Sequence, residues 1–136
     1  MKYFFNVFII SFFLVSFVKK EDPNPQFTLK LEAKGCHYQI MMNNEQIDEG
    51  KTYQVVSKTY DLTKKISEEE QTIQISMMQI SREMPLKVTQ AYVNLSLEKT
   101  VGDSVKIIKT IKLPTFEYDE EENQPQSIGG SISFKP

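Results

Sequence analysis

The sequence of 136 residues predicts an all-β protein, a single antiparallel β-sandwich of roughly seven or eight strands with jelly-roll or immunoglobulin-like organisation. Three observations favour this class. Apolar and polar residues alternate with a period of two over most of the chain after residue 26. Turn-forming residues separate these segments at intervals of roughly 10 to 14 residues. No amphipathic helical pattern is long enough to cover a sheet. A small closed barrel is the alternative.

Residues 1–20 are predicted to be a signal peptide or an uncleaved N-terminal anchor. An almost unbroken apolar run covers residues 3–18, with Lys2 before it and two lysines after it. A helix of this length rises about 24 Å, less than the roughly 30 Å of a bilayer's hydrocarbon core, which favours a cleaved signal. The anchor stays open as an alternative, because no A-x-A cleavage pattern follows the run. Both alternatives predict a secreted, periplasmic or cell-envelope protein.

Residues 21–26 are predicted to be a tether, and residues 27–136 the β-sandwich domain. Pro23 and Pro25 fix their own backbone angles and exclude a helix at this point. The N-terminal segment holds three of the 16 basic residues, which leaves 13 against 18 acidic residues, or a formal charge of −5, for the rest. Such a domain, with scattered lysines, lacks the basic patch that binds phosphates. The sequence therefore predicts no nucleic-acid partner.

The first two strands are predicted on either side of Gly35. Every second residue is apolar over residues 27–33, and again over residues 36–42. Asn43 and Asn44 then predict a turn, since asparagine tolerates the left-handed backbone conformation.

The next part of the chain combines turn signals with a charged segment. Residues 48–50, Asp-Glu-Gly, predict a turn, and the alternation over residues 53–57 predicts the strand after it. Residues 61–71 contain Ser67 and three consecutive glutamates, and we expect a loop with a short helical turn. Alternation resumes over residues 73–77 and predicts another strand.

Three further strands are expected towards the end of the chain. The clearest alternation covers residues 91–97, and a second apolar face is expected at positions 105, 107, 111 and 113. Gly102 and Asp103 predict a hairpin between these two strands. The last strand is expected over residues 128–134, with a bulge or kink at Gly129 and Gly130.

Part of this pattern is shared with a known group of proteins. The pattern consists of the run Gly-Cys-His-Tyr-Gln-Ile over residues 35–40, the turn at Asn43 and Asn44, and residues 66–75 with the run Gln-Thr-Ile. In its spacing of strands and turns it resembles small exported bacterial β-sandwich proteins of the jelly-roll type, many of unknown function. The resemblance covers less than half of the chain and implies no functional residue.

Cys36 and His37 are the one place where a nucleophile adjoins a base in the sequence. Adjacent residues of a strand point to opposite faces, so they cannot form a catalytic dyad. We interpret Cys36 as a buried thiol and His37 as a surface imidazole, whose replacement by alanine should leave function intact. One cysteine and one histidine cannot complete a tetrahedral zinc site without two carboxylates. The sequence predicts no catalytic residue, no metal and no cofactor.

Other candidate sites have simple structural interpretations. Residues 117–122 hold five acids and could bind Ca²⁺ through Asp119 and Glu121, but they lack the spacing of a calcium loop, so we expect a solvated loop. Asn94 begins a glycosylation sequon. Five methionines are expected to fill the core, with an adaptable partner surface as the alternative: Met41, Met42, Met77, Met78 and Met84.

The sequence therefore predicts a non-enzymatic extracytoplasmic β-sandwich that acts as a binding or interaction module of the cell envelope or secreted fraction. Its expected partner is a protein or a surface glycan on an exposed sheet face, and membrane contact is expected only through an uncleaved N-terminal segment. One alternative is a hydrolase of a surface polymer, which needs a pocket with two convergent carboxylates. The other is a structural subunit that assembles through edge strands, which needs a long uncovered edge.

Overall fold

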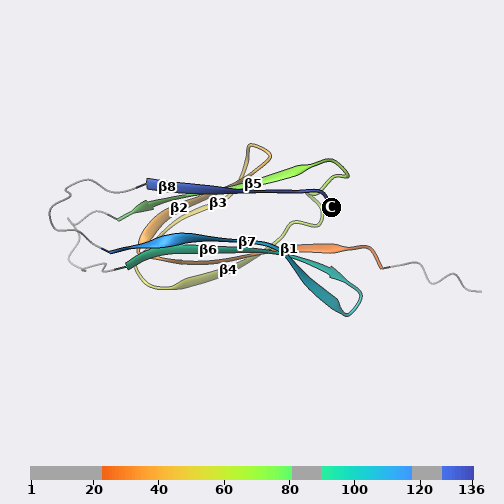
Figure 1. The fold of residues 1–136 in the computed structure, drawn as a ribbon, viewed down its shortest axis with the longest axis horizontal. Coiled ribbons are helices and arrows are strands. Elements are labelled where there is room, and N and C mark those ends of the chain that lie inside the picture. Colours follow the sequence, from red (N-terminus) through yellow and green to blue (C-terminus); the bar gives the residue numbers. More distant parts are fainter. Residues whose placement is uncertain (1–22, 81–89, 118–126) are drawn as a thin grey trace, which may run out of the picture.

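The computed structural model describes residues 23–80, 90–117 and 127–136, which contain eight strands (Figure 1). In chain order these are β1 (Gln26–Lys34), β2 (Cys36–Met42), β3 (Glu45–Thr52), β4 (Val56–Asp61), β5 (Gln71–Gln79), β6 (Gln90–Val101), β7 (Ser104–Glu117) and β8 (Ser127–Phe134). No helix that could cross a membrane occurs in these ranges.

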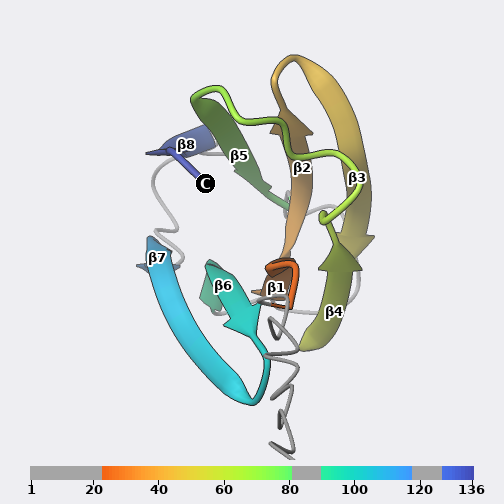
Figure 2. The same cartoon turned by 90° about the vertical axis from the view of Figure 1, so that its right-hand side faces the viewer.

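The strands form two antiparallel sheets that face each other (Figure 2). One sheet has the order β4-β1-β6-β7 and the other the order β3-β2-β5-β8. The predicted β-sandwich is therefore confirmed, with eight strands. Strands β1 and β2 lie in opposite sheets, whereas the first two strands of an immunoglobulin constant domain are neighbours in one sheet.

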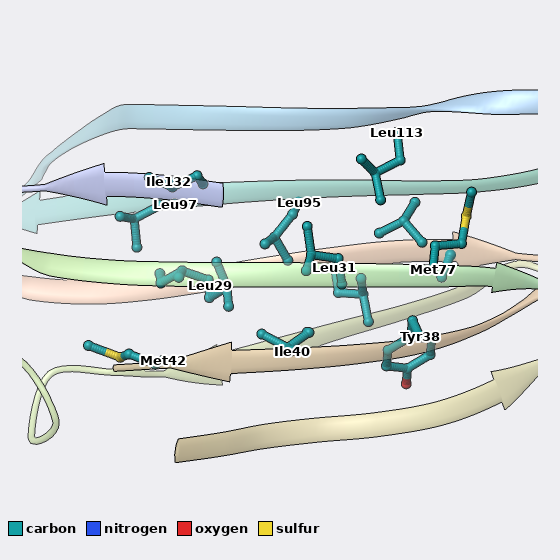
Figure 3. Packing of buried hydrophobic residues seen from close by; sticks show 14 of the residues in the cluster. Leu29, Leu31, Tyr38, Ile40, Met42, Met77, Leu95, Leu97, Leu113 and Ile132 are labelled. Atoms are coloured by element: carbon teal, nitrogen blue, oxygen red, sulfur yellow. The ribbon is translucent and has the colours of Figure 1, made fainter. Parts of the chain in front are cut away.

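The core lies between the sheets and is built from alternate residues of their inner faces (Figure 3). Leu29, Leu31 and Leu95 come from one sheet and pack against Ile40 and Met77 of the other. All five side chains are at most 2% exposed, and burial of each stabilises the fold by roughly 1.5 to 3 kcal/mol relative to exposure. This is the outcome that the period-two alternation predicted.

The predicted turns at the strand ends are confirmed by their backbone angles. Gly35, which separates β1 from β2, has a φ of 67°. Asn43 and Asn44 have φ values of 49° and 68°, and two successive positive φ values are the mark of a type I′ hairpin. Gly102 has a φ of 58° at the two-residue connection between β6 and β7. The segment between β4 and β5 is a loop, as expected, but its turn covers residues 63–65 and no helical turn forms after Ser67.

The expected turn at residues 48–50 is wrong, because β3 runs straight through it. Tyr38 in β2 lies opposite Gly50, and a Cβ atom on Gly50 would come within 2.6 Å of the Tyr38 hydroxyl oxygen. Gly50 therefore makes room for a buried tyrosine ring and does not turn the chain. The strand expected over residues 53–57 begins later than expected, because Tyr53 to Val55 connect β3 to β4, which begins at Val56.

The apolar face expected for β7 is wrong in the first half of the strand, where the apolar side chains point to solvent. The pairing of β6 with β7 shifts between Leu97 and Glu98, and Ile108 occupies the irregular position. This bulge reverses the direction of the alternation, so Val105 and Ile107 are 62% and 59% exposed. Only the later part of the strand follows the prediction, because Leu113 is buried.

The bulge expected in β8 is also wrong, since β5 and β8 pair in one continuous register. The two glycines instead allow neighbouring parts of the chain to come close to β8. A Cβ atom on Gly130 would lie 3.1 Å from the Cγ2 atom of Ile111 in the facing sheet, and one on Gly129 would lie 3.2 Å from the carbonyl oxygen of Ile75. The acidic segment with Asp119 and Glu121, expected to be a solvated loop, lies outside the described residues, and so does Met84.

Candidate functional site

An open groove of about 440 Å³ lies on the sheet formed by β3, β2, β5 and β8. Its side chains are mostly those that point away from the core, because they alternate with the buried residues of β2 and β5. The lining residues are His37, Tyr38, Gln39, Glu49, Gly50, Lys51, Ser76, Met77, Met78 and Ser127.

The strand register arranges the outward side chains of the groove in two rows across the sheet. The first row, from β3 to β8, consists of Lys51, His37, Met78 and Ser127. The second row consists of Glu49, Gln39 and Ser76 and ends at Gly129 of β8, which has no side chain. Neighbours within a row have Cβ atoms about 4.5 to 5.5 Å apart, so one ligand can contact several of them together.

The groove offers hydrogen bonds and one apolar contact. Its polar groups are an imidazole, an amide and two hydroxyls, and its two charges, on Lys51 and Glu49, are opposite in sign. The Gln39 amide nitrogen donates to the Gln46 amide oxygen at 3.1 Å, which orients Gln39 along the sheet. Met78 is 43% exposed and supplies the apolar contact. This chemistry suits a polar ligand of low net charge.

The structure places Cys36 and His37 on opposite faces of β2, as predicted. Cys36 is fully buried, while His37 is exposed in the groove. His37 was expected to be dispensable because it has no partner within its own strand. The register gives His37 neighbours from β3 and β5, Lys51 and Met78, and His37 lines the groove with them.

The Cys36 thiol is held in its neutral form by the core. Burial raises the pKa of Cys36 to about 11, although a backbone hydrogen bond at Lys34 acts in the opposite direction. The thiol also donates to the Tyr92 carbonyl oxygen, with 3.8 Å between sulfur and oxygen. Since the thiolate is the nucleophilic and metal-binding form, this position is unsuited to either chemistry.

A second polar cluster lies where the edges of the two sheets meet. One carboxylate oxygen of Asp48 accepts three hydrogen bonds, from the Lys58 ammonium at 2.8 Å, the Tyr60 hydroxyl at 2.6 Å and the Tyr38 hydroxyl at 3.2 Å. The Lys58 nitrogen also lies 5.5 Å from the centre of the Tyr38 ring. Because β3 belongs to one sheet and β4 to the other, the Asp48 cluster joins the sheets.

The protonation states of the Asp48 cluster suit a structural role. Burial acts to raise the pKa of Asp48, but the hydrogen bonds from Lys58 and Tyr60 and the charge of Lys58 outweigh it and hold that pKa below its usual range. Burial and the Asp48 carboxylate raise the pKa of Tyr60. Neither group titrates near neutral pH, as a general acid or base would. Sequence reasoning missed this cluster because it placed Asp48 in a turn.

The remaining candidate residues are separate from the groove. Asn94 is half-buried on the outer face of the other sheet, and its amide nitrogen donates to a Glu32 carboxylate oxygen at 3.4 Å. Met42 and Met77 lie in the core as predicted, whereas Met41 is half-buried. Within residues 23–80, 90–117 and 127–136, no three His, Cys, Asp or Glu side chains converge as a metal site would require.

The described part of the groove therefore has the chemistry of a binding surface, with hydrogen-bonding groups in two rows and an exposed methionine. Glu49 is the one carboxylate among its lining residues in the described ranges. In comparisons with protein-family models, curated proteins and solved structures, the chain matches none of them.

Proposed function

We propose that this protein is a non-enzymatic, extracytoplasmic binding module of the cell envelope or secreted fraction, and that its groove receives a segment of a partner protein. The observation that carries the proposal is the pair of cross-strand rows centred on His37 and Gln39. At about 440 Å³ the groove falls within the range of roughly 300 to 1,000 Å³ that is common for ligand sites.

A protein segment fits this groove better than a glycan does. The exposed thioether of Met78 is a soft, adaptable contact of the kind that protein-binding surfaces use repeatedly. Lys51 and Glu49 lie two residues apart on one strand and can pair with opposite charges of a peptide. The amide, hydroxyl and imidazole groups can meet the donors and acceptors of its backbone.

The hydrolase alternative is less favoured by these residues. Glycoside hydrolysis through carboxylates uses two of them, about 5 to 9 Å apart. Within the described residues, the groove holds Glu49 alone, and Asp48 is engaged by Lys58, Tyr60 and Tyr38 on the inner side of β3.

Site-specific crosslinking tests the proposal. A photo-crosslinking amino acid replaces Met78 in the groove, and in the control it replaces Thr110, which is exposed on the other sheet. We expect a discrete crosslinked partner from position 78 only, and a several-fold lower yield when His37→Ala or Gln39→Ala is added. The same products from both positions, or yields that these substitutions leave unchanged, would contradict the proposal.

Export is a separate part of the proposal and rests on the apolar run before the domain. The intact mass of the protein recovered from the medium or envelope tests it. A mass lower by an N-terminal segment ending near residue 20 supports a cleaved signal, and the full mass in the membrane fraction supports an anchor. Recovery of the full-length protein from the cytoplasm would exclude export.

Assembly through an edge strand is the second candidate, and β8 favours it. Edge strands are normally protected by charge, bulges or shortness. Three of the four edge strands have such protection: β7 carries lysines and a bulge, β4 is short with six residues, and the pairing of β3 with β2 contains a register shift. Strand β8 instead has eight residues, none charged, in one continuous register.

Sedimentation of the folded chain over a range of concentrations tests this second candidate. If β8 pairs with a second copy, Ser131→Lys should shift the assembly towards monomers, because a lysine on an edge strand opposes pairing. Thr110→Lys is the control on the opposite sheet. A wild-type chain that stays monomeric at every concentration would exclude assembly through β8.

A further inference from the structure

The β6–β7 hairpin gathers exposed aliphatic side chains at one end of the molecule. Among the described residues, five large hydrophobic side chains are exposed, and three of them, Val101, Val105 and Ile107, belong to this hairpin. The last pair between β1 and β6 joins Gln26 to Thr100, so the residues of the tip extend beyond β1 (Figure 1). Nothing in the described sandwich covers these side chains.

The exposure of this tip is built into the strand pairing. The bulge at Ile108 turns that side chain towards the core and reverses the alternation before it. Val105 and Ile107 therefore point outward from the sheet at 62% and 59% exposure. Without the bulge, one uninterrupted register would place them on the inner face with Ile111 and Leu113.

The same tip carries positive charges that face each other. Lys99 and Lys106 are directly opposite in the β6–β7 register, and like charges in that arrangement destabilise a strand pair. Glu98, the nearest acid in sequence, is engaged by Lys30 at 2.9 Å on the other face, and Asp103 lies in the turn. The Lys99 nitrogen lies 5.5 Å from the centre of the Phe27 ring, and an anionic ligand at the tip would reduce the repulsion between the two lysines.

The chain enters the domain beside this tip. A Cβ atom on Gly102 would lie 3.5 Å from the Cγ atom of Pro23. The apolar run of the sequence ends at Val18, and the five residues from there to Pro23 span at most about 18 Å. Any membrane that holds the apolar run therefore lies within reach of the hairpin tip.

We propose that the tip formed by residues 99–107 is a membrane-contact element. Val105 and Ile107 on the outer face of the hairpin, and Val101 on its other face, enter the interfacial layer of the bilayer, while Lys99 and Lys106, on the same face as Val101, bind anionic lipid headgroups. The contact orients the sandwich so that the groove on β3, β2, β5 and β8 lies to the side and stays open to a partner. The inference rests on the anchor alternative of the proposed export, in which the N-terminal segment stays uncleaved, and it is independent of what the groove binds.

A single fluorescent label tests the proposal in the full chain. Val105→Cys carries an environment-sensitive probe, and Val55→Cys, also an exposed valine but at the opposite end of the sandwich, is the matched control. The buried Cys36 does not compete for the label. Each protein is reconstituted with vesicles of phosphatidylcholine, with or without phosphatidylglycerol.

We expect a blue shift and quenching by lipid-borne quenchers at position 105 and neither at position 55. The shift should be larger with phosphatidylglycerol, and Lys99→Glu with Lys106→Glu should remove that difference. A water-like spectrum at position 105 in both vesicle types would overturn the proposal. So would a blue shift that is already complete without vesicles, which would show that protein covers the tip. Equal melting temperatures of the two labelled variants control for folding.

Discussion

At the scale of single residues, Asp48 accepts three hydrogen bonds at the edge of the sandwich. Its three donors come from β2 and β4, so one carboxylate connects strands of both sheets. The groups are partly open to solvent, with side-chain exposures of 23% for Asp48 and 40% for Lys58. This exposure limits how much each hydrogen bond contributes to stability.

Asp48→Asn should lower the free energy of unfolding by about 1 to 2 kcal/mol at pH 7, since it leaves Lys58 without its counter-charge. The pKa of Asp48 is lowered in the folded state. Its contribution is therefore present above the unfolded pKa of about 3.9 and is lost as pH falls through the folded pKa. Urea unfolding at pH 7 and pH 3 checks this. A difference between the two proteins that is the same at both pH values would contradict it.

Cys36 should be inert towards thiol reagents in the native protein. Burial raises its pKa to about 11, so the reactive thiolate is scarce at neutral pH as well as inaccessible. Because burial penalises the thiolate, the stability of the fold is unaffected by this group below the unfolded pKa of about 8.5 and falls as pH rises from there towards 11. A colorimetric thiol assay in buffer and in urea measures the reactivity. Rapid native labelling, or a disulfide-linked dimer, would disprove the prediction.

At the scale of elements, glycine positions decide how close the strands can come. Gly50→Ala should cost about 1 to 3 kcal/mol, because its Cβ atom would meet the buried Tyr38 ring and push the hydroxyl away from Asp48. Glu49→Ala, an exposed change on the same strand, is the control and should have little effect. Thermal melts of both variants provide the comparison. Equal melting temperatures would show that Tyr38 can move without loss.

At the scale of the whole molecule, stability depends on one continuous apolar core between the sheets. Leu95→Lys should unfold the domain, since Leu95 is fully buried and an unpaired ammonium there costs several kcal/mol of a total of roughly 5 to 15. Thr110→Lys places the same charge on the outer face and should leave the fold intact. Circular dichroism distinguishes the two. A folded Leu95→Lys protein would show that the core is more adaptable than its packing indicates.

Much of the fold could be predicted from short-range patterns. Strands β1, β2, β5 and β6 followed from the alternation of apolar residues, because an extended backbone turns successive side chains to opposite faces. The Asn43 and Asn44 turn followed because few residues adopt positive φ. The outward direction of His37 followed from the same alternation.

The sequence by itself determined the class of fold, most of the core residues and the burial of Cys36, since these depend on the alternation of residues within each strand. Tertiary structure decided the role of Gly50, which depends on Tyr38 in another strand, and the outward turn of Val105, which depends on a bulge in the pairing with β6. It also decided the groove, whose rows combine residues of β3, β2, β5 and β8. Register sets which residues of different strands become neighbours, and it arises from the packing of the whole sandwich.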